Sequence, residues 1–175
     1  MKAVFIGGSR NISRLNLSIR DRLDRLIGQS LPVLIGDANG ADKAVQQHLS
    51  DRAYSKVQVF CMNGHCRNNV GNWPLIEVAA PKNVRGAEFY STKDREMTSK
   101  ASLGFMLWDG KSSGTLANIL RLIAQEKPVV VYHSKLHEFA NLKTRSYLDL
   151  FLTRCGIEAQ RGLAGIRELP ERALF

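Results

Sequence analysis

The chain has 175 residues, of which 44% are hydrophobic and 23% are charged. These proportions are typical of a globular domain that builds its own core, and they exclude an intrinsically disordered chain. No apolar run approaches the roughly 18 to 20 residues of a membrane-spanning helix. The short apolar start of the chain also differs from a secretory signal. We therefore expect a single domain, residues 1–175, located in the cytoplasm and without a membrane partner.

The formal net charge is +9, and the basic residues are spread along the chain rather than gathered in a tail. A basic balance favours anionic partners such as nucleotides or nucleic acid. The three cysteines do not make a disulfide framework, and no second ligand pair lies at zinc-site spacing. We therefore expect Cys61 in a buried strand and Cys66 in a loop. His133 and His137 are expected to form a surface pair, so the sequence predicts no metal site and no cofactor.

In the first half of the chain, short apolar runs alternate with amphipathic stretches. Apolar runs that end at glycine or polar turns are typical of buried strands, which we expect at 2–6, 31–35 and 57–62. Apolar residues recurring every three or four positions, with charged residues between them, are typical of helices. On this basis we expect helices at 12–26 and 41–49.

In the second half, residues 63–87 lose this periodicity. A loop of that length is often a binding loop or lid; the alternative is an insertion that contains a short extra strand near residues 76–78. Ser91 or Thr92 is a suitable cap for a helix at 93–100. Further elements are expected as strand 103–108, helix 113–125, strand 128–132 and helix 138–154.

Strands separated by helices predict a mainly parallel sheet with right-handed crossovers. The expected fold class is therefore α/β, a Rossmann-like three-layer sandwich with about five strands. Its core would span residues 2–132, and a helical segment would follow at 138–175.

Three predicted strands lead into polar turns that contain glycine, at residues 7–10, 36–42 and 109–115. In a parallel sheet these turns lie on one edge, where open α/β sheets bind ligands. Glycine permits close backbone approach, and Ser9 and Arg10 add donors that suit phosphate. The third turn opens a helix, whose N-terminus favours an anion. Neither the dinucleotide-binding nor the P-loop fingerprint is present, but the three turns together predict a phosphate-containing ligand.

These turns resemble those of the SLOG superfamily, which includes the Lonely Guy phosphoribohydrolases and the DNA-processing protein A family. The resemblance covers residues 2–132, and 109–115 is also similar to a turn of nucleoside deoxyribosyltransferases. It implies a nucleotide-like small-molecule ligand, association into a homodimer or higher homo-oligomer and, in several members, cleavage of N-glycosidic bonds.

The ligand-binding residues expected from the turns and the resemblance form one set. They are Gly7, Gly8, Ser9, Arg10, Asn39, Gly40, Asp42, Lys93, Asp109, Gly110, Lys111, Ser112, Ser113, Gly114 and Thr115. The backbone of 110–115 and residues 8–10 would hold phosphate, and Asp109, with Asn39 or Asp42, would hold the sugar or support the turns. Trp73, Tyr90 and Trp108 are candidates for stacking on a base.

One departure from the family pattern concerns catalysis. The resemblance places a sugar-directed glutamate three residues after Thr115, and this chain has Asn118 there. We therefore expect nucleotide or nucleotide-sugar binding without the usual catalytic glutamate. One alternative is an N-glycosidase or deoxyribosyltransferase-like enzyme that uses Asp109 with Glu88 or Asp94 as catalytic residues. A second alternative is single-stranded nucleic-acid binding.

Overall fold

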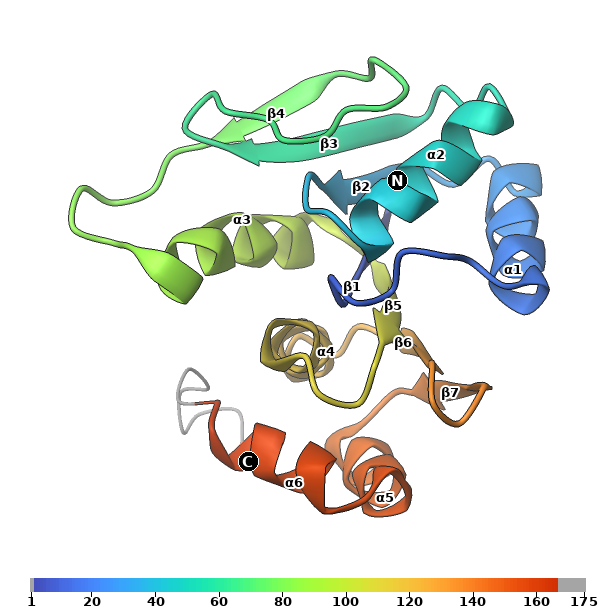
Figure 1. Ribbon diagram of the computed structural model, residues 1–175, viewed down its shortest axis with the longest axis vertical. Coiled ribbons are helices and arrows are strands. Elements are labelled where there is room, and N and C mark those ends of the chain that lie inside the picture. The colour runs from blue at the N-terminus through green and yellow to red at the C-terminus, as the bar shows by residue number, and fades with distance from the viewer. Residues whose placement is uncertain (1, 167–175) are drawn as a thin grey trace.

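The computed structural model describes residues 2–166, which form a seven-stranded sheet covered by helices on both faces (Figure 1). The strands are β1 (Val4–Gly8), β2 (Val33–Gly36), β3 (Val57–Met62), β4 (Leu75–Val78), β5 (Leu103–Trp108), β6 (Val129–His133) and β7 (Glu138–Leu142). The helices are α1 (Leu17–Gly28), α2 (Ala41–Asp51), α3 (Gly86–Lys100), α4 (Ser113–Ala124), α5 (Arg145–Cys155) and α6 (Ile157–Ala164).

The sheet order is β4-β3-β2-β1-β5-β6-β7, and every neighbouring pair is parallel except β6 and β7. Alternate residues of the central strands enter two separate apolar clusters. Val4 and Ile6 of β1 pack with α1 and α2, whereas Phe5 packs with the helices of the opposite face. This period-two alternation of apolar residues buries both faces of the sheet. The predicted Rossmann-like α/β sandwich is confirmed.

The sheet has two more strands than the five expected. One is β4, so the segment 63–87 does contain the extra strand considered as an alternative. The other is β7, which occupies the start of the helix expected at 138–154 and corrects that prediction. Phe139 packs on the α1 side of the sheet while Leu142 packs on the other, an alternation that belongs to a strand. Helix α5 begins only after Thr144, whose hydroxyl accepts from the Tyr147 amide at 3.5 Å.

Two helices begin at positions different from those expected. Helix α1 starts at Leu17 rather than near residue 12, because the Asn16 side chain caps it by accepting from the Ile19 amide at 3.0 Å. Helix α3 starts at Gly86 rather than at 93, so the loop before it is shorter than expected. The final part of the expected 138–175 helical segment, residues 167–175, lies outside the described residues.

The order in which the strands are added to the sheet changes direction at β1. The chain moves outward from β1 through β2 and β3 to β4, and then returns to the other side of β1 as β5. The carboxyl ends of β1 and β5 therefore border a topological switch point, where such sheets bind ligands. Within residues 2–166 no helix has the length and apolar character required to cross a membrane.

Close packing at this switch point leaves no room for a side chain at Gly8. A Cβ atom at Gly8 would lie 2.4 Å from the Leu107 carbonyl oxygen and 2.8 Å from the Ala41 Cβ. We expect Gly8→Ala to destabilise the protein by about 1–3 kcal/mol, the usual cost of overpacking. Gly28→Ala is the control, because a Cβ at Gly28 meets nothing within 4 Å. Urea unfolding of both variants tests this, and equal stability of the two would contradict the packing described.

Candidate functional site

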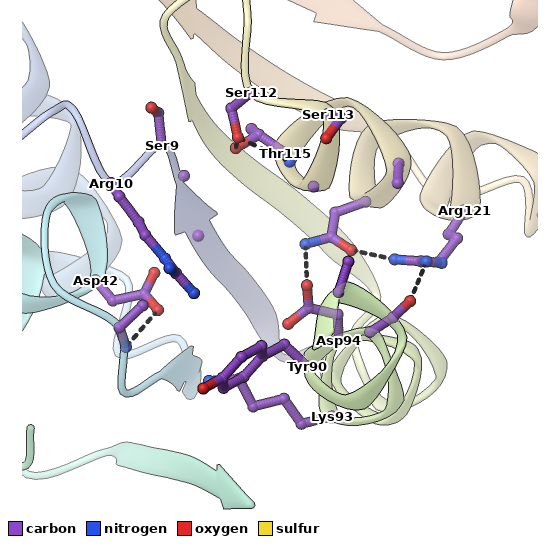
Figure 2. Close-up of a pocket in the computed structure, with 18 of the residues that line it drawn as sticks. Ser9, Arg10, Asp42, Tyr90, Lys93, Asp94, Ser112, Ser113, Thr115 and Arg121 are labelled. Atoms are coloured by element: carbon purple, nitrogen blue, oxygen red, sulfur yellow. Dashed lines mark hydrogen bonds between the residues drawn. The ribbon is translucent and has the colours of Figure 1, made fainter. Parts of the chain in front are cut away.

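A cavity of about 680 Å³ opens at the carboxyl ends of β1, β2 and β5. This volume is within the range of small-molecule binding sites. Residues from all three predicted turns meet here, as does α3 (Figure 2). The lining residues that the sequence identified are Gly7, Gly8, Ser9, Arg10, Asp42, Tyr90, Lys93, Asp94, Asp109, Lys111, Ser112, Ser113, Gly114 and Thr115.

One end of the cavity is the N-terminus of α4. The Ser112 hydroxyl caps this helix by accepting from the Thr115 amide at 3.3 Å and the Thr115 hydroxyl at 2.9 Å. The amides of Ser113 and Gly114 belong to the first turn, which has no intrahelical acceptors for its N–H groups. A Cβ at Gly114 would meet nothing within 4 Å, so this end is open to a ligand. The helix dipole adds partial positive charge, which suits an anion.

Asp109 binds the first and third turns together. One carboxylate oxygen accepts from the Lys111 and Ser112 amides at 3.0 and 2.8 Å. The other accepts from the Ser9 hydroxyl at 2.9 Å and the Asn11 side-chain amide at 2.8 Å. Burial raises the pKa of Asp109, but these hydrogen bonds outweigh it and the net pKa is lowered. Asp109 is therefore an ionised group with four protein donors.

Three other predicted residues support the turns instead of lining the cavity. Gly40 has φ +83°, and a Cβ there would lie 2.3 Å from the Arg10 carbonyl oxygen. Gly110 has φ +80°, and a Cβ there would lie 2.7 Å from Nε2 of His133. Both positions require glycine because of the backbone conformation and of the close approach. Asn39 is exposed and accepts from the Asn68 side chain at 3.0 Å.

The cavity wall away from the N-terminus of α4 carries two carboxyl groups (Figure 2). Asp42, in the first turn of α2, accepts from the Ala38 amide at 3.1 Å. Asp94 accepts from the Asn118 side-chain amide at 3.0 Å (Figure 2). Asn118, which stands where the resemblance places a glutamate, thus holds an aspartate at the cavity. Its own oxygen accepts from the Arg121 guanidinium at 2.6 Å.

Burial dominates the titration of these two carboxyl groups. It raises the pKa of Asp42 to about 7, with the Lys93 charge opposing and the Asp94 charge reinforcing the shift. Burial also raises the pKa of Asp94. Lys93, predicted to bind ligand, lines the cavity and forms a buried ion pair with Asp37. The Asp42 carboxyl therefore lacks a directly paired cation within the described part of the chain.

Arg67 lines the cavity and was not identified from the sequence. Its backbone amide and Nε both donate to Asp37 at 3.1 Å, and its Nη2 donates at 2.8 Å. Burial raises the pKa of Asp37, but the Arg67 and Lys93 donors outweigh this and hold it far below the usual range. Asp37 thus fixes two cations at the edge of the cavity.

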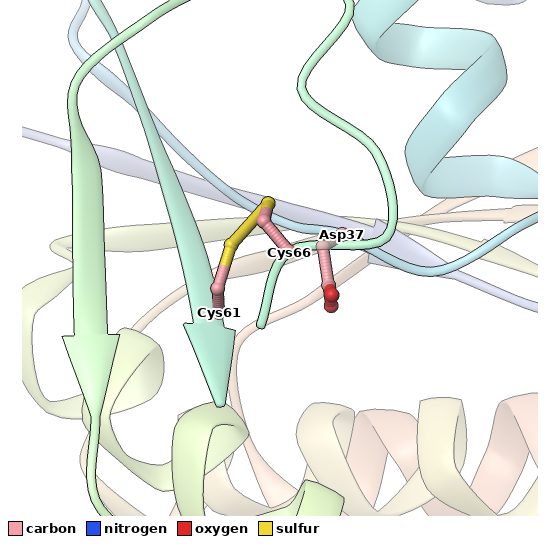
Figure 3. A group of neighbouring side chains, drawn as sticks. All are labelled: Asp37, Cys61 and Cys66. Atoms are coloured by element: carbon pink, nitrogen blue, oxygen red, sulfur yellow. A yellow bond between two sulfur atoms is a disulfide. The ribbon is translucent and has the colours of Figure 1, made fainter. Parts of the chain in front are cut away.

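A disulfide joins Cys61 at the end of β3 to Cys66, the residue before Arg67 (Figure 3). Cys61 lies in a buried strand and Cys66 in a loop, as expected, but the expectation of no disulfide was wrong, because the chain turns back after β3 and brings residue 66 beside the strand. The two sulfur atoms and an Asp37 oxygen all lie within 4.8 Å of one another, a spacing that would suit a metal ion. The disulfide and the ion pairs of Asp37 already engage these groups.

The remaining candidates fall into different environments. Trp73 is 7% exposed and donates to the Tyr54 carbonyl at 2.8 Å, so it is a core residue, as is Trp108. Tyr90 is exposed and lines the cavity. Glu88 is not a lining residue and pairs with Arg95 at 2.7 Å. His133 is buried, which corrects the expected surface pair; the hairpin to β7 covers it, and its Nδ1 accepts from the Leu136 amide at 3.1 Å.

Comparisons with known proteins bear on the fold. No protein-family model matches the chain, and no curated protein matches it. Its structure is similar to a solved structure of DNA processing protein A from Helicobacter pylori, which was described for the way that protein binds single-stranded DNA. The TM-score is 0.60 at 14% sequence identity, and the match covers 89% of this chain and 74% of that chain. At this identity the similarity supports a shared Rossmann-like fold.

The raised pKa of Asp42 makes a prediction about stability. The folded state keeps the Asp42 proton up to about pH 7, whereas the unfolded chain releases it near 3.8. Asp42 therefore makes the wild type less stable as pH rises between these values, by at most about 1.4 kcal/mol per pH unit. We expect Asp42→Asn to gain stability relative to wild type between pH 5 and pH 8.

Urea unfolding at pH 5, 6, 7 and 8 measures this difference. Asp21→Asn, a change at an exposed aspartate of α1, is the control and should run parallel to wild type. A parallel profile for Asp42→Asn as well would show that Asp42 does not hold its proton in the folded state.

Proposed function

We propose that the protein binds a nucleotide or a nucleotide-sugar derivative in the cavity at the carboxyl edge of the sheet. The observation that carries this proposal is the polarity of the cavity. An anion-binding helix terminus lies at one end, and two carboxyl groups with an aromatic ring lie across from it. A ligand that matches both ends carries an anionic group and hydrogen-bond donors on one small framework, as a nucleotide does.

Arg10 is the side chain expected to meet the phosphate. It is exposed, lines the cavity and forms no ion pair with a carboxylate of residues 2–166. A guanidinium group offers donors in a planar fork that matches phosphate oxygens. Together with the Ser113 and Gly114 amides, Arg10 would neutralise the anion.

The two carboxyl groups would meet the sugar. A single donor within residues 2–166, the Ala38 amide, reaches the Asp42 carboxyl, and the Asn118 amide reaches Asp94. Each carboxyl therefore retains an oxygen for a ligand hydroxyl. The N–H groups and positive dipole end of α4 suit the phosphate better than this wall does, which orients the ligand with its anion toward α4.

The proposed function is binding of the ligand, without catalysis. Asp109 has four protein donors, and Glu88 pairs with Arg95 away from the cavity. These contacts favour structural roles for both residues. Asp94 is the member of the proposed catalytic set that lines the cavity with a raised pKa. The enzymatic alternative therefore depends on Asp94, and release of free base from a bound nucleotide would support it.

A second candidate function is single-stranded nucleic-acid binding. The fold similarity to a DNA processing protein A and the net charge of +9 favour it. Such binding would weaken steeply as salt increases, because protein cations release counterions from phosphates. Absence of oligonucleotide binding at low salt would remove this candidate.

The primary test is thermal unfolding with a panel of nucleoside mono-, di- and triphosphates and ADP-ribose. A ligand at 100 times its dissociation constant stabilises the folded state by about 2.7 kcal/mol, which raises the Tm by several degrees. We expect such a shift in wild type, and its loss in Arg10→Ala. Arg25→Ala is the matched control, because it removes the same charge from an exposed position on α1.

The outcomes separate clearly. Loss of the shift in Arg10→Ala, with retention in Arg25→Ala, supports phosphate binding at the cavity. An equal loss in both variants would point to a general effect of charge. No shift with any member of the panel would refute nucleotide binding at the concentrations used.

A further inference from the structure

Tyr90 is the exposed aromatic ring of the cavity wall. Its side chain is 37% exposed, whereas Phe5, which also lines the cavity, is 1% exposed and belongs to the core. Tyr90 projects from α3 toward the cavity, and Figure 2 shows its ring between the side chains of Asp42 and Asp94. The edge-on ring of Phe89, centred 5.3 Å away, packs beside it.

Two guanidinium groups lie against the Tyr90 ring. The central guanidinium carbon of Arg67 is 4.8 Å from the ring centroid, and that of Arg10 is 5.5 Å away. Both distances are within the range of a cation–π contact. A flat, partly exposed ring with planar cations beside it is a surface that suits another planar group.

The two arginines differ in their freedom to move. Arg67 donates to Asp37 through its backbone amide, Nε and Nη2, and the disulfide at Cys66 restrains the chain just before it. Arg10 has no carboxylate partner among residues 2–166. An exposed cation–π contact is a weak interaction compared with a charge-assisted hydrogen bond to phosphate. A ligand phosphate would therefore draw Arg10 away from Tyr90 while Arg67 stays in place.

We propose that Tyr90 stacks against the base of the bound nucleotide, on the ring surface that Arg10 leaves when it turns to the phosphate. This inference rests on the proposed function and adds to it the group that recognises the base. The phosphate is expected at the N-terminus of α4 with Arg10, and sugar hydroxyls are matched to the carboxyl groups of Asp42 and Asp94. The planar base is then the part of the ligand that fits the aromatic ring.

Isothermal titration tests the role of Tyr90 with two kinds of probe. Ribose 5-phosphate lacks a base, and AMP, GMP, CMP and UMP carry one on the same framework. We expect wild type to bind at least one of these nucleotides on the order of tenfold to hundredfold tighter than ribose 5-phosphate, the usual gain from stacking one base. Tyr90→Ala should remove this advantage, so that the variant binds the nucleotide and ribose 5-phosphate with similar affinity.

Tyr90→Phe is the matched control. No described residue hydrogen-bonds to the Tyr90 hydroxyl, so phenylalanine should retain both the fold and the base advantage. Thermal unfolding of all three proteins shows that the variants are folded. Loss of ribose 5-phosphate binding in Tyr90→Ala would instead assign Tyr90 a structural role and overturn the inference.

The remaining outcomes distinguish this inference from the proposed function. If wild type binds ribose 5-phosphate and all four nucleotides equally, or if Tyr90→Ala keeps the base advantage, the stacking role fails while phosphate binding stands. If wild type binds none of these probes, the proposed function fails and the stacking role fails with it. Comparing TMP with a 5′-phosphorylated oligothymidylate shows whether the base belongs to a free nucleotide or to the end of a DNA strand. If the oligonucleotide binds more tightly than TMP, and Tyr90→Ala removes that binding, Tyr90 stacks on the terminal base of a strand.

Discussion

The Asp109 carboxylate is the contact on which the geometry of the cavity depends. It accepts from two backbone amides of its own turn and from Ser9 and Asn11 of the turn after β1, about a hundred residues earlier in the chain. Charge-assisted hydrogen bonds are stronger than neutral ones, and four of them in a partly buried place hold both turns rigidly. The N-terminus of α4 and the loop carrying Arg10 are consequently presented to the same space.

A second charged cluster organises the opposite wall. Asp37 pairs with both Lys93 and Arg67, so its single negative charge engages two cations. Asp42 and Asp94 remain without a directly paired cation of their own in the described residues, and burial raises the pKa of each. Charged groups that are buried without full pairing cost stability. The protein tolerates this cost at a cavity, where a ligand that donates hydrogen bonds would relieve it.

Local sequence signals predicted the turns well, because a glycine-containing polar turn after a strand is encoded within a few residues. The fold class followed from the alternation of strands and helices for the same reason. Tyr90 was named from the sequence as one of three aromatic candidates for stacking, but the contribution of Arg67 was not predictable in this way. Arg67 reaches the cavity only because the chain folds back after β3 and Asp37 receives it. Strand β7 was missed because its five residues are too few for period two to be distinguished from a helix.

Nucleotide binding at the carboxyl edge of the sheet is tested most directly by an amide chemical-shift titration of the protein with AMP, GMP, CMP and UMP. The amides of Ser113 and Gly114 and those of residues 9–11 should shift first and most strongly with a nucleotide that binds. A second groove between α1 and α2, lined by Arg14, Arg20 and Arg52 among others, provides the contrasting location. Shifts confined to that groove, with the α4 amides unmoved, would contradict nucleotide binding at the carboxyl edge of the sheet.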